Sequence, residues 1–251
     1  MANPGGNYPG RQIFLGRIIT GEPAFAYFGS GRSPPSQARY ATKFIEGENA
    51  IRMKPTNPNE KFDPFRHYQA VRIDPETGLL VVSNSQAPND AVFEAYKFMP
   101  DEQKICSDFL QRLLGVIGPE YDSKDKPTSR VVGVFPGLIG EKYRYILGIT
   151  TGRDSAHAVD IGMLPGHFAY IQTYNGDVDY KNMDPELLMD GNTIFTTDAK
   201  TAEELANEIY DISDYVDPKY GELRVWCIAG LHNGNGPGGW DIARRNRHKV
   251  E

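Results

Sequence analysis

The chain has 251 residues, of which 39% are hydrophobic and 24% charged, and its formal net charge is −6 at pH 7. These values are ordinary for a soluble globular domain, and the negative charge argues against general nucleic-acid binding. No apolar run approaches the roughly 20 residues that cross a bilayer, and the N-terminal residues lack the features of a secretory signal. We therefore expect a cytoplasmic protein with no membrane contact.

Charge is unevenly placed along the chain. Residues 11–72 carry ten Lys and Arg against five Asp and Glu, whereas residues 173–222 carry three against thirteen. A basic N-terminal third in an acidic protein fits a small anionic ligand better than a polymer. The two cysteines, Cys106 and Cys227, lie far apart in unlike contexts, so we predict buried, reduced thiols. No Cys/His spacing indicates a metal site.

Strands and turns dominate the first part of the chain. Two turn signals, Gly21-Glu22-Pro23 and Asp74-Pro75-Glu76-Thr77-Gly78, each separate two apolar segments and predict two hairpins. The predicted strands cover residues 12–20, 24–28, 67–73 and 79–83. Prolines at positions 55, 58 and 64 predict irregular structure over residues 54–64.

Helical patterns follow. Residues 91–98 and 101–114 are predicted helices, the second with Gly115 as its cap, and Asp184-Pro185 opens a short helix that ends near Gly191. Thr201-Ala202-Glu203-Glu204 is a capping box. The apolar residues behind it recur at helical spacing and predict an amphipathic helix; they are Leu205, Ile209, Ile212 and Val216.

Further strands are predicted over residues 130–135, 143–150, 168–174 and 223–229, with a hairpin turn at Asn175-Gly176. Strands and helices do not alternate, which predicts an α+β fold of mainly antiparallel sheets in a single domain spanning residues 1–251. Residues 1–10 are expected to form a loose leader and residues 233–251 a loose tail. Neither a P-loop nor a dinucleotide fingerprint is present.

The stretch Tyr27–Tyr40 has the composition of an anion-binding loop. An apolar strand gives way to glycines, serines and prolines together with Arg32 and Arg39. Guanidinium groups suit phosphate or carboxylate, and glycine lets the backbone approach a ligand closely. The alternative is an ordinary surface turn, since glycine, proline and serine are common in turns.

Three other segments carry candidate chemistry. Tyr68 lies between cations in Arg66–Arg72 and is a candidate for proton transfer, although a strand tyrosine also commonly serves only in packing. Asn84 and Ser85 lie in a polar segment, residues 82–90, suited to reading an amide or a purine edge, or to capping a helix. Residues 151–157 contain Ser, Asp and His, but adjacency in sequence does not indicate a catalytic triad.

A series of short blocks, in this order, resembles the archaeal-type IMP cyclohydrolase family. The resemblance extends over about residues 11–180, and the blocks are residues 25–35, 68–73, 82–85, 121–133, 145–149 and 170–175. Three positions depart from the family pattern, namely Gln69, Gly31 and Ser129. These departures bear on substrate identity more than on fold.

The resemblance implies a four-layer αββα sandwich like that of N-terminal nucleophile hydrolases. The first residues, Met1-Ala2-Asn3, do not supply the nucleophile of that class. The family resemblance also implies a homo-oligomer. It further implies an enzyme that closes the ring of 5-formamidoimidazole-4-carboxamide ribonucleotide (FAICAR) to form IMP in purine biosynthesis. That reaction requires neither a metal nor another cofactor.

The resemblance also implies roles for individual residues. Arg32 would stabilise the formyl oxygen or bind phosphate, Tyr68 would transfer the proton, and Arg130 would pair with phosphate or orient Tyr68. The residues implied to contact the purine ribonucleotide are Ser30, Ser33, Asn84, Ser85 and Asn175. Asn84 and Asn175 would read the base or the carboxamide.

Two other functions remain open from the sequence. The changes at Gln69 and Gly31 fit a purine-nucleotide-binding protein that has lost catalysis. An amidohydrolase on the same fold would use Ser30 or Ser33 as its nucleophile.

Overall fold

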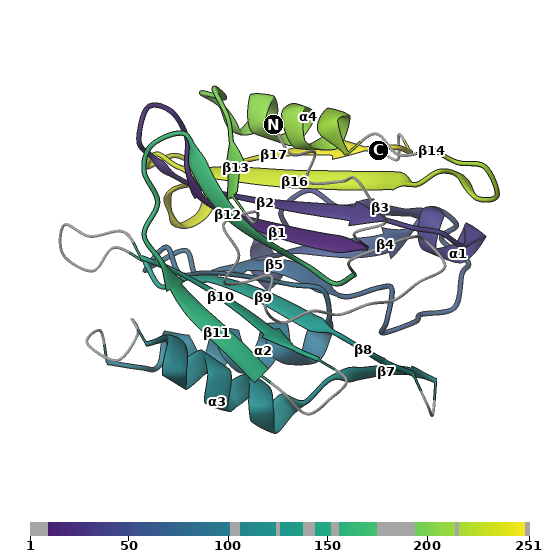
Figure 1. Cartoon of the computed structure of the whole chain (residues 1–251), viewed down its shortest axis with the longest axis horizontal. Coiled ribbons are helices and arrows are strands. Elements are labelled where there is room, and N and C mark those ends of the chain that lie inside the picture. The colour runs from purple at the N-terminus through teal and green to yellow at the C-terminus, as the bar shows by residue number, and fades with distance from the viewer. Residues whose placement is uncertain are drawn as a thin grey trace.

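The computed structural model describes residues 10–100, 106–123, 126–137, 144–151, 156–174, 194–213 and 216–248. Two β-sheets lie face to face, and helices cover the outer face of each sheet (Figure 1). The strands of both sheets pair antiparallel wherever neighbours are described, which confirms the α+β prediction.

The first sheet has six strands in the order β13-β12-β1-β2-β16-β17. Its centre is the predicted hairpin of β1 (Arg11–Arg17) and β2 (Pro23–Ser30), in which Ile13 pairs with Tyr27. Every residue of β2 is buried, because neighbouring strands flank it and both faces of the sheet are covered. The remaining strands are β12 (His167–Gln172), β13 (Ile194–Thr196), β16 (Arg224–His232) and β17 (Trp240–Asn246).

The second sheet has seven strands in the order β11-β10-β9-β6-β5-β4-β3. It contains the second predicted hairpin, between β5 (Gln69–Ile73) and β6 (Leu80–Ser83). The others are β3 (Arg39–Ala41), β4 (Ala50–Pro55), β9 (Arg130–Phe135), β10 (Tyr145–Thr150) and β11 (Ala156–Ile161). Two small hairpins stand outside the sheets, formed by β7 (Glu120–Ser123) with β8 (Lys126–Thr128) and by β14 (Val216–Asp217) with β15 (Gly221–Glu222).

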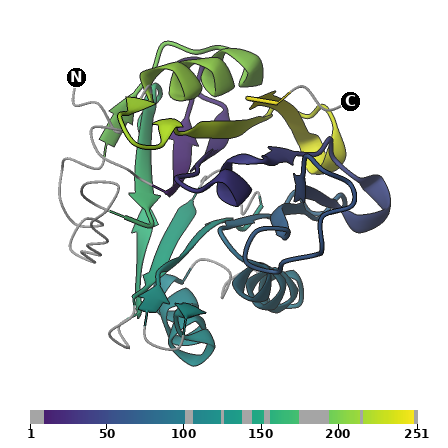
Figure 2. The ribbon, with the colours of Figure 1, turned by 90° about the vertical axis from the view of Figure 1, so that its right-hand side faces the viewer.

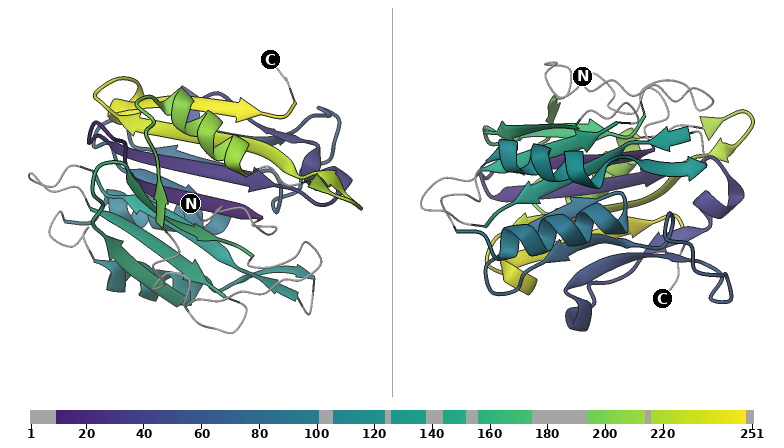
Figure 3. Two further views of the ribbon diagram at one scale, coloured as in Figure 1. Left: turned by 45° about the horizontal axis from the view of Figure 1, so that its top comes forward. Right: turned by 90° about the horizontal axis from the view of Figure 1, so that it is seen from below.

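Helix α4 (Ala202–Ile212) covers the six-stranded sheet, while α2 (Gln86–Lys97) and α3 (Ser107–Ile117) cover the seven-stranded sheet (Figures 2 and 3). The side chain of Thr201 accepts a hydrogen bond from the Glu204 amide, so the predicted cap of α4 is present. A single turn, α1 (Pro34–Gln37), follows β2, and the described residues include two short 3-10 segments, η1 (Glu46–Glu48) and η5 (Pro237–Gly239). None of the described helices is long and apolar enough to cross a membrane.

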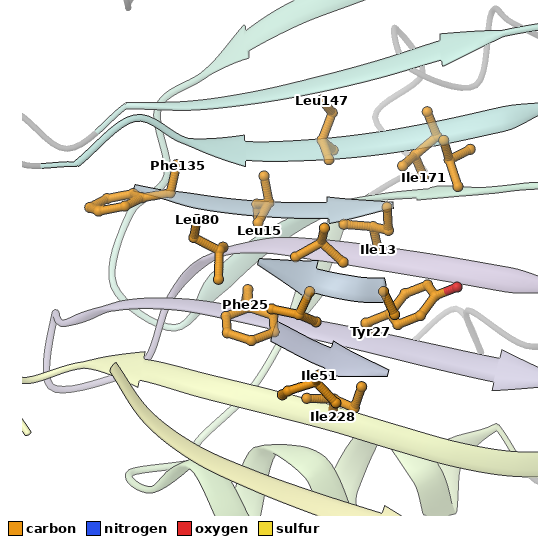
Figure 4. Close-up of a cluster of buried hydrophobic side chains, with 14 of the residues drawn as sticks. Ile13, Leu15, Phe25, Tyr27, Ile51, Leu80, Phe135, Leu147, Ile171 and Ile228 are labelled. Carbon is orange, nitrogen blue, oxygen red and sulfur yellow. The ribbon is translucent and has the colours of Figure 1, made fainter. Parts of the chain in front are cut away.

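Three hydrophobic clusters hold these layers together. The largest lies between the sheets, where side chains such as Ile13 and Phe25 face Leu80 and Phe135 (Figure 4). A second joins α4 to the six-stranded sheet, and a third joins α2 and α3 to the seven-stranded sheet. Full burial of one large apolar side chain contributes about 1.5–3 kcal/mol, so these clusters are the main source of stability.

The C-terminal region differs most from the sequence prediction. Residues 240–246 are not part of a loose tail but form β17, which pairs with β16 along its whole length. Backbone hydrogen bonds and the burial of Trp240 fix this strand despite its polar residues. Strand β11 was also not predicted, because its alternation is weak and its exposed positions are polar.

Helix boundaries differ in three places. Helix α3 runs past Gly115 to Ile117 and ends at Gly118, whose φ of 68° suits glycine. Helix α2 begins at Gln86 rather than residue 91, since Pro88 is tolerated in a first turn. Val216 belongs to β14 and not to α4. The leader at residues 1–9, the turn at Asn175-Gly176 and the short helix predicted after Asp184 lie outside the described residues.

Candidate functional site

Polar side chains gather where the two sheets share one end, which we call the polar end. Strand β1 starts here and β2 ends here, since Arg11 pairs with Gly29. In the other sheet β6 ends beside the start of β9, and Thr150 at the end of β10 pairs with Arg130. The polar residues buried at these strand ends are Ser30, Gln69, Ser83, Asn84, Ser85, Ser129, Thr150, Thr151 and Thr173. Buried polar groups require hydrogen-bond partners, so this end is built for polar contacts.

Two tyrosine hydroxyls meet between the sheets at this end. The hydroxyl of Tyr27, from β2, lies 2.7 Å from that of Tyr68, which immediately precedes β5. The Nε of Arg11 donates to the Tyr68 oxygen at 3.4 Å. The Nη1 of Arg11 donates to the carbonyls of Gly10 and Ser30 at 3.0 and 2.5 Å. Both tyrosines are fully buried, whereas Arg11 is partly exposed.

Trp226 forms a platform beside the tyrosine pair. The guanidinium carbons of Arg11 and Arg39 lie 4.9 and 4.8 Å from the centroid of its ring, within the range of cation–π attraction. The indole Nε1 is buried and has no hydrogen-bond partner among the described residues. Gly29 pairs with Trp226, and a Cβ at Gly29 would approach the ring to 2.1 Å, so glycine is required there.

Arg39 is fully buried, which is uncommon for a charged side chain. Its Nε donates to the carbonyl of Ser36 at 2.9 Å and its Nη1 to that of Arg66 at 3.4 Å. These bonds tie the segment after β2 to the start of β5, and they place a positive charge beside Trp226.

The surroundings of Tyr27 favour its neutral form. Burial, followed by the proximity of Tyr68, raises the pKa of Tyr27 well above its ordinary value, although the charges of Arg11 and Arg39 act in the opposite direction. Tyr27 therefore keeps its proton at physiological pH. Nearby, burial lowers the pKa of His67, whose Nδ1 accepts a hydrogen bond from the Asp63 amide at 3.0 Å.

The residues predicted around Arg32 come together at the end of β2. Arg32 is half-buried and lies between β2 and α1. The hydroxyl of Ser30 donates to the carbonyl of Gly10 at 3.1 Å, and Ser33 caps α1 and bonds to Ser36. Within the described part of the chain, neither serine hydroxyl bonds to a basic side chain, so the amidohydrolase alternative gains no support.

The other predicted residues divide into those already engaged and those with spare hydrogen-bonding capacity. The Asn84 amide donates to the carbonyl of Ser129 and accepts from the Val131 amide, both at 2.9 Å, and so joins the end of β6 to the start of β9. The buried hydroxyl of Ser85 has no partner among the described residues. Arg130 donates through Nη1 to the carbonyl of Ile117 at 3.4 Å. Asn175 lies outside the described residues.

Sequence reasoning missed Arg11, Tyr27 and Trp226 as members of this site. Tyr27 was correctly placed in a strand, now β2, but its side chain was given no part in the site. The Tyr68 oxygen accepts a hydrogen bond from the Nε of Arg11, a contact that the sequence did not predict. The described ranges contain no group of three or more His, Cys, Asp or Glu side chains able to hold a metal ion.

Comparison with known proteins gives one family. A family model described as "IMP cyclohydrolase-like protein" matches residues 8–229. The chain therefore belongs to the IMP cyclohydrolase-like family, and this membership associates it with purine-nucleotide chemistry. A search of curated proteins finds no match. The matched range includes Arg11, Tyr27, Tyr68 and Trp226, while β17 lies beyond it.

Proposed function

We propose that the protein is an IMP cyclohydrolase, which closes the ring of FAICAR to give IMP and water. The carboxamide nitrogen attacks the formyl carbon of the same molecule, a C–N bond forms, and the formyl oxygen departs as water. Because both reacting groups belong to one substrate, orientation supplies much of the rate. The protein must also move a proton and stabilise charge on the formyl oxygen.

The observation that carries this proposal is the Tyr68 hydroxyl, held between the sheets by Arg11 and Tyr27. In its ionised form, Tyr68 takes one proton from the carboxamide nitrogen, becomes neutral, and returns that proton to the departing oxygen. The second proton of the released water comes from the formamido nitrogen. A tyrosinate oxygen that accepts hydrogen bonds in a water-poor interior suits this exchange, since its negative charge is stabilised without rearranging solvent.

Cations at the polar end would bind the rest of the substrate. Arg32 would stabilise the formyl oxygen or bind the 5′-phosphate, and Arg130 would pair with phosphate. Ser30, Ser33, Ser85 and Asn175 remain proposed contacts to the nucleotide. Tyr68 is fully buried, so we expect the polar end to open when substrate enters.

Incubation with FAICAR, with IMP followed by its ultraviolet absorbance, tests the proposal. We expect turnover well above the spontaneous rate, and a loss of at least about 100-fold in kcat for Tyr68→Phe. Thermal unfolding would verify that the variant is folded. A folded wild-type protein with no rate above background contradicts the proposal.

One observation favours a second candidate, a purine-nucleotide-binding protein without catalysis. The complete burial of Tyr68 leaves its hydroxyl inaccessible to substrate unless the site opens. Such a protein would bind IMP in calorimetry while producing none from FAICAR. The implied homo-oligomer and cytoplasmic location are separate proposals, tested by light scattering and by localisation of a tagged protein.

A further inference from the structure

One member of the tyrosine pair, Tyr27, takes no part in the proton transfers of the proposed reaction. Its hydroxyl is fully buried, and among the described residues its single hydrogen-bond partner is Tyr68. Two hydroxyls 2.7 Å apart share one hydrogen bond, so one donates and the other accepts. The neighbouring groups decide which oxygen carries the charge when the pair loses a proton.

The number of hydrogen-bond donors to each oxygen indicates which tyrosine carries the charge. If the charge lies on Tyr68, its oxygen accepts one bond from Tyr27 and one from Arg11 Nε. If the charge lies on Tyr27, its oxygen accepts only from Tyr68. Hydrogen bonds to ionised groups are worth about 1.5–3 kcal/mol, so the arrangement with two donors wins.

The apolar surroundings of Tyr27 also favour placing the charge on Tyr68. Tyr27 packs against Trp226, with ring centroids 6.2 Å apart, and lies within the cluster between the sheets. Figure 4 shows its ring among the aliphatic side chains of that cluster. Burial raises the pKa of Tyr27, while the charges acting on it from β1 and β3 are those of Arg11 and Arg39. The residue before Tyr68, His67, faces Glu60 at 3.8 Å.

We propose that Tyr27 is a positioning residue. It keeps its own proton and donates a hydrogen bond to the Tyr68 oxygen, so Tyr68 is the member of the pair that exchanges protons with substrate. This inference rests on the proposed function for its catalytic meaning, but the hydrogen bond can be tested without substrate. The carboxamide proton moves onto the Tyr68 oxygen and off again, and the Tyr27 proton stays in place throughout.

The first test is an alkaline titration of tyrosinate absorbance. Subtracting the titration curve of Tyr68→Phe from that of the wild type isolates the ionisation that requires Tyr68. The same subtraction is then made between Tyr27→Phe and the double variant Tyr27→Phe/Tyr68→Phe. We expect that ionisation to move about one to two pH units upward when the Tyr27 hydroxyl is removed. Tyr96→Phe is the matched control, because Tyr96 is also fully buried and its hydroxyl has no partner among the described residues. An unchanged ionisation in Tyr27→Phe overturns the proposal.

The second test is the pH dependence of kcat. In Tyr27→Phe we expect the limb of the pH profile that reports loss of the Tyr68 proton to move upward by the same one to two pH units. As a result, kcat at neutral pH should fall about 10- to 100-fold and recover at alkaline pH. A purely structural role would lower kcat equally at every pH. If wild type makes no IMP but the absorbance shift appears, the proposed function fails and the hydrogen-bond assignment stands.

If Tyr27→Phe does not fold, the wild-type protein still decides the matter. Tyrosine labelled at Cζ gives a resonance for each residue, and its chemical shift reports ionisation. The resonance that disappears in Tyr68→Phe belongs to Tyr68. The remaining resonance that this substitution shifts most belongs to Tyr27. The proposal requires the Tyr27 resonance to stay neutral while that of Tyr68 titrates, and ionisation of Tyr27 first overturns it.

Discussion

The two tryptophans of the chain are both fully buried, yet they lie in opposite kinds of environment. Trp240 pairs with His232 at the end of β16, where its Nε1 donates to the carbonyl of Gly78 at 3.0 Å. Its ring meets those of Phe25, Phe135 and His232 edge to face. Trp226 lies near the start of β16, beside two guanidinium groups, and its Nε1 has no partner among the described residues.

This difference distinguishes an end of the molecule that supplies stability from the end at which we place the proposed site. At the Trp240 end the indole N–H is satisfied and the neighbours are aromatic, which is how a core obtains stability. At the Trp226 end, buried charge and an unpaired donor reduce stability unless a ligand or water completes them. We therefore expect substitutions at the first end to affect unfolding and those at the second to affect nucleotide chemistry.

Trp240→Ala should show the largest effect on stability. Removing a fully buried indole from an aromatic cluster leaves a cavity and should lower the free energy of unfolding by about 3–5 kcal/mol. Chemical denaturation followed by circular dichroism measures it. A loss below about 1 kcal/mol would show that the cluster contributes little to the fold.

Asn84→Ala and Ser85→Ala compare a structural side chain with a proposed binding side chain at two adjacent residues of the polar end. Asn84→Ala leaves the Val131 amide and the Ser129 carbonyl without their partner, so we expect a loss of about 2–3 kcal/mol in unfolding free energy. Ser85→Ala removes a hydroxyl without a described partner, so stability should stay within about 0.5 kcal/mol while IMP binding weakens. Equal stability losses in the two variants would contradict this division.

Trp240→Phe and Trp226→Phe sharpen the comparison, because both remove the same atoms. Only Trp240→Phe leaves a carbonyl, that of Gly78, without its donor. We expect it to lose about 1–2 kcal/mol more unfolding free energy than Trp226→Phe. Denaturant titrations of the two variants in parallel measure the difference, and a larger loss in Trp226→Phe would reverse the assignment of the two ends.

The smallest effect concerns pH. Burial lowers the pKa of His232, so the folded protein binds its proton less readily than the unfolded chain does. The stability linked to this group is present above the unfolded pKa of about 6.5 and is lost as pH falls from there through the lower pKa of the folded state. His232→Gln should therefore flatten the decline of unfolding free energy as pH falls below about 6.5. An unaltered slope would exclude the histidine as its source.

Much of the fold could be predicted from local patterns. The hairpin signals at residues 21–23 and 74–78 and the capping box at Thr201 predicted elements that are present. Strand β17 could not be predicted, because its polar residues are held by pairing with β16 and by Trp240, contacts that a local pattern does not contain.

Local composition made Arg32 and Tyr68 candidates, and the family resemblance gave them their proposed roles. Tyr27 and Arg11 reach Tyr68 across 41 and 57 residues of chain, and Trp226 comes from a strand near the other terminus. Such contacts are set by the order of strands in the two sheets, which short sequence blocks do not specify.

The placement of the site at the Trp226 end is tested most directly by fluorescence of two single-tryptophan variants. Trp240→Phe keeps only Trp226, and Trp226→Phe keeps only Trp240. IMP titrated into Trp240→Phe should change the emission of Trp226 in a saturable manner, whereas in Trp226→Phe the emission of Trp240 should stay constant. A saturable change confined to Trp240 would contradict the account.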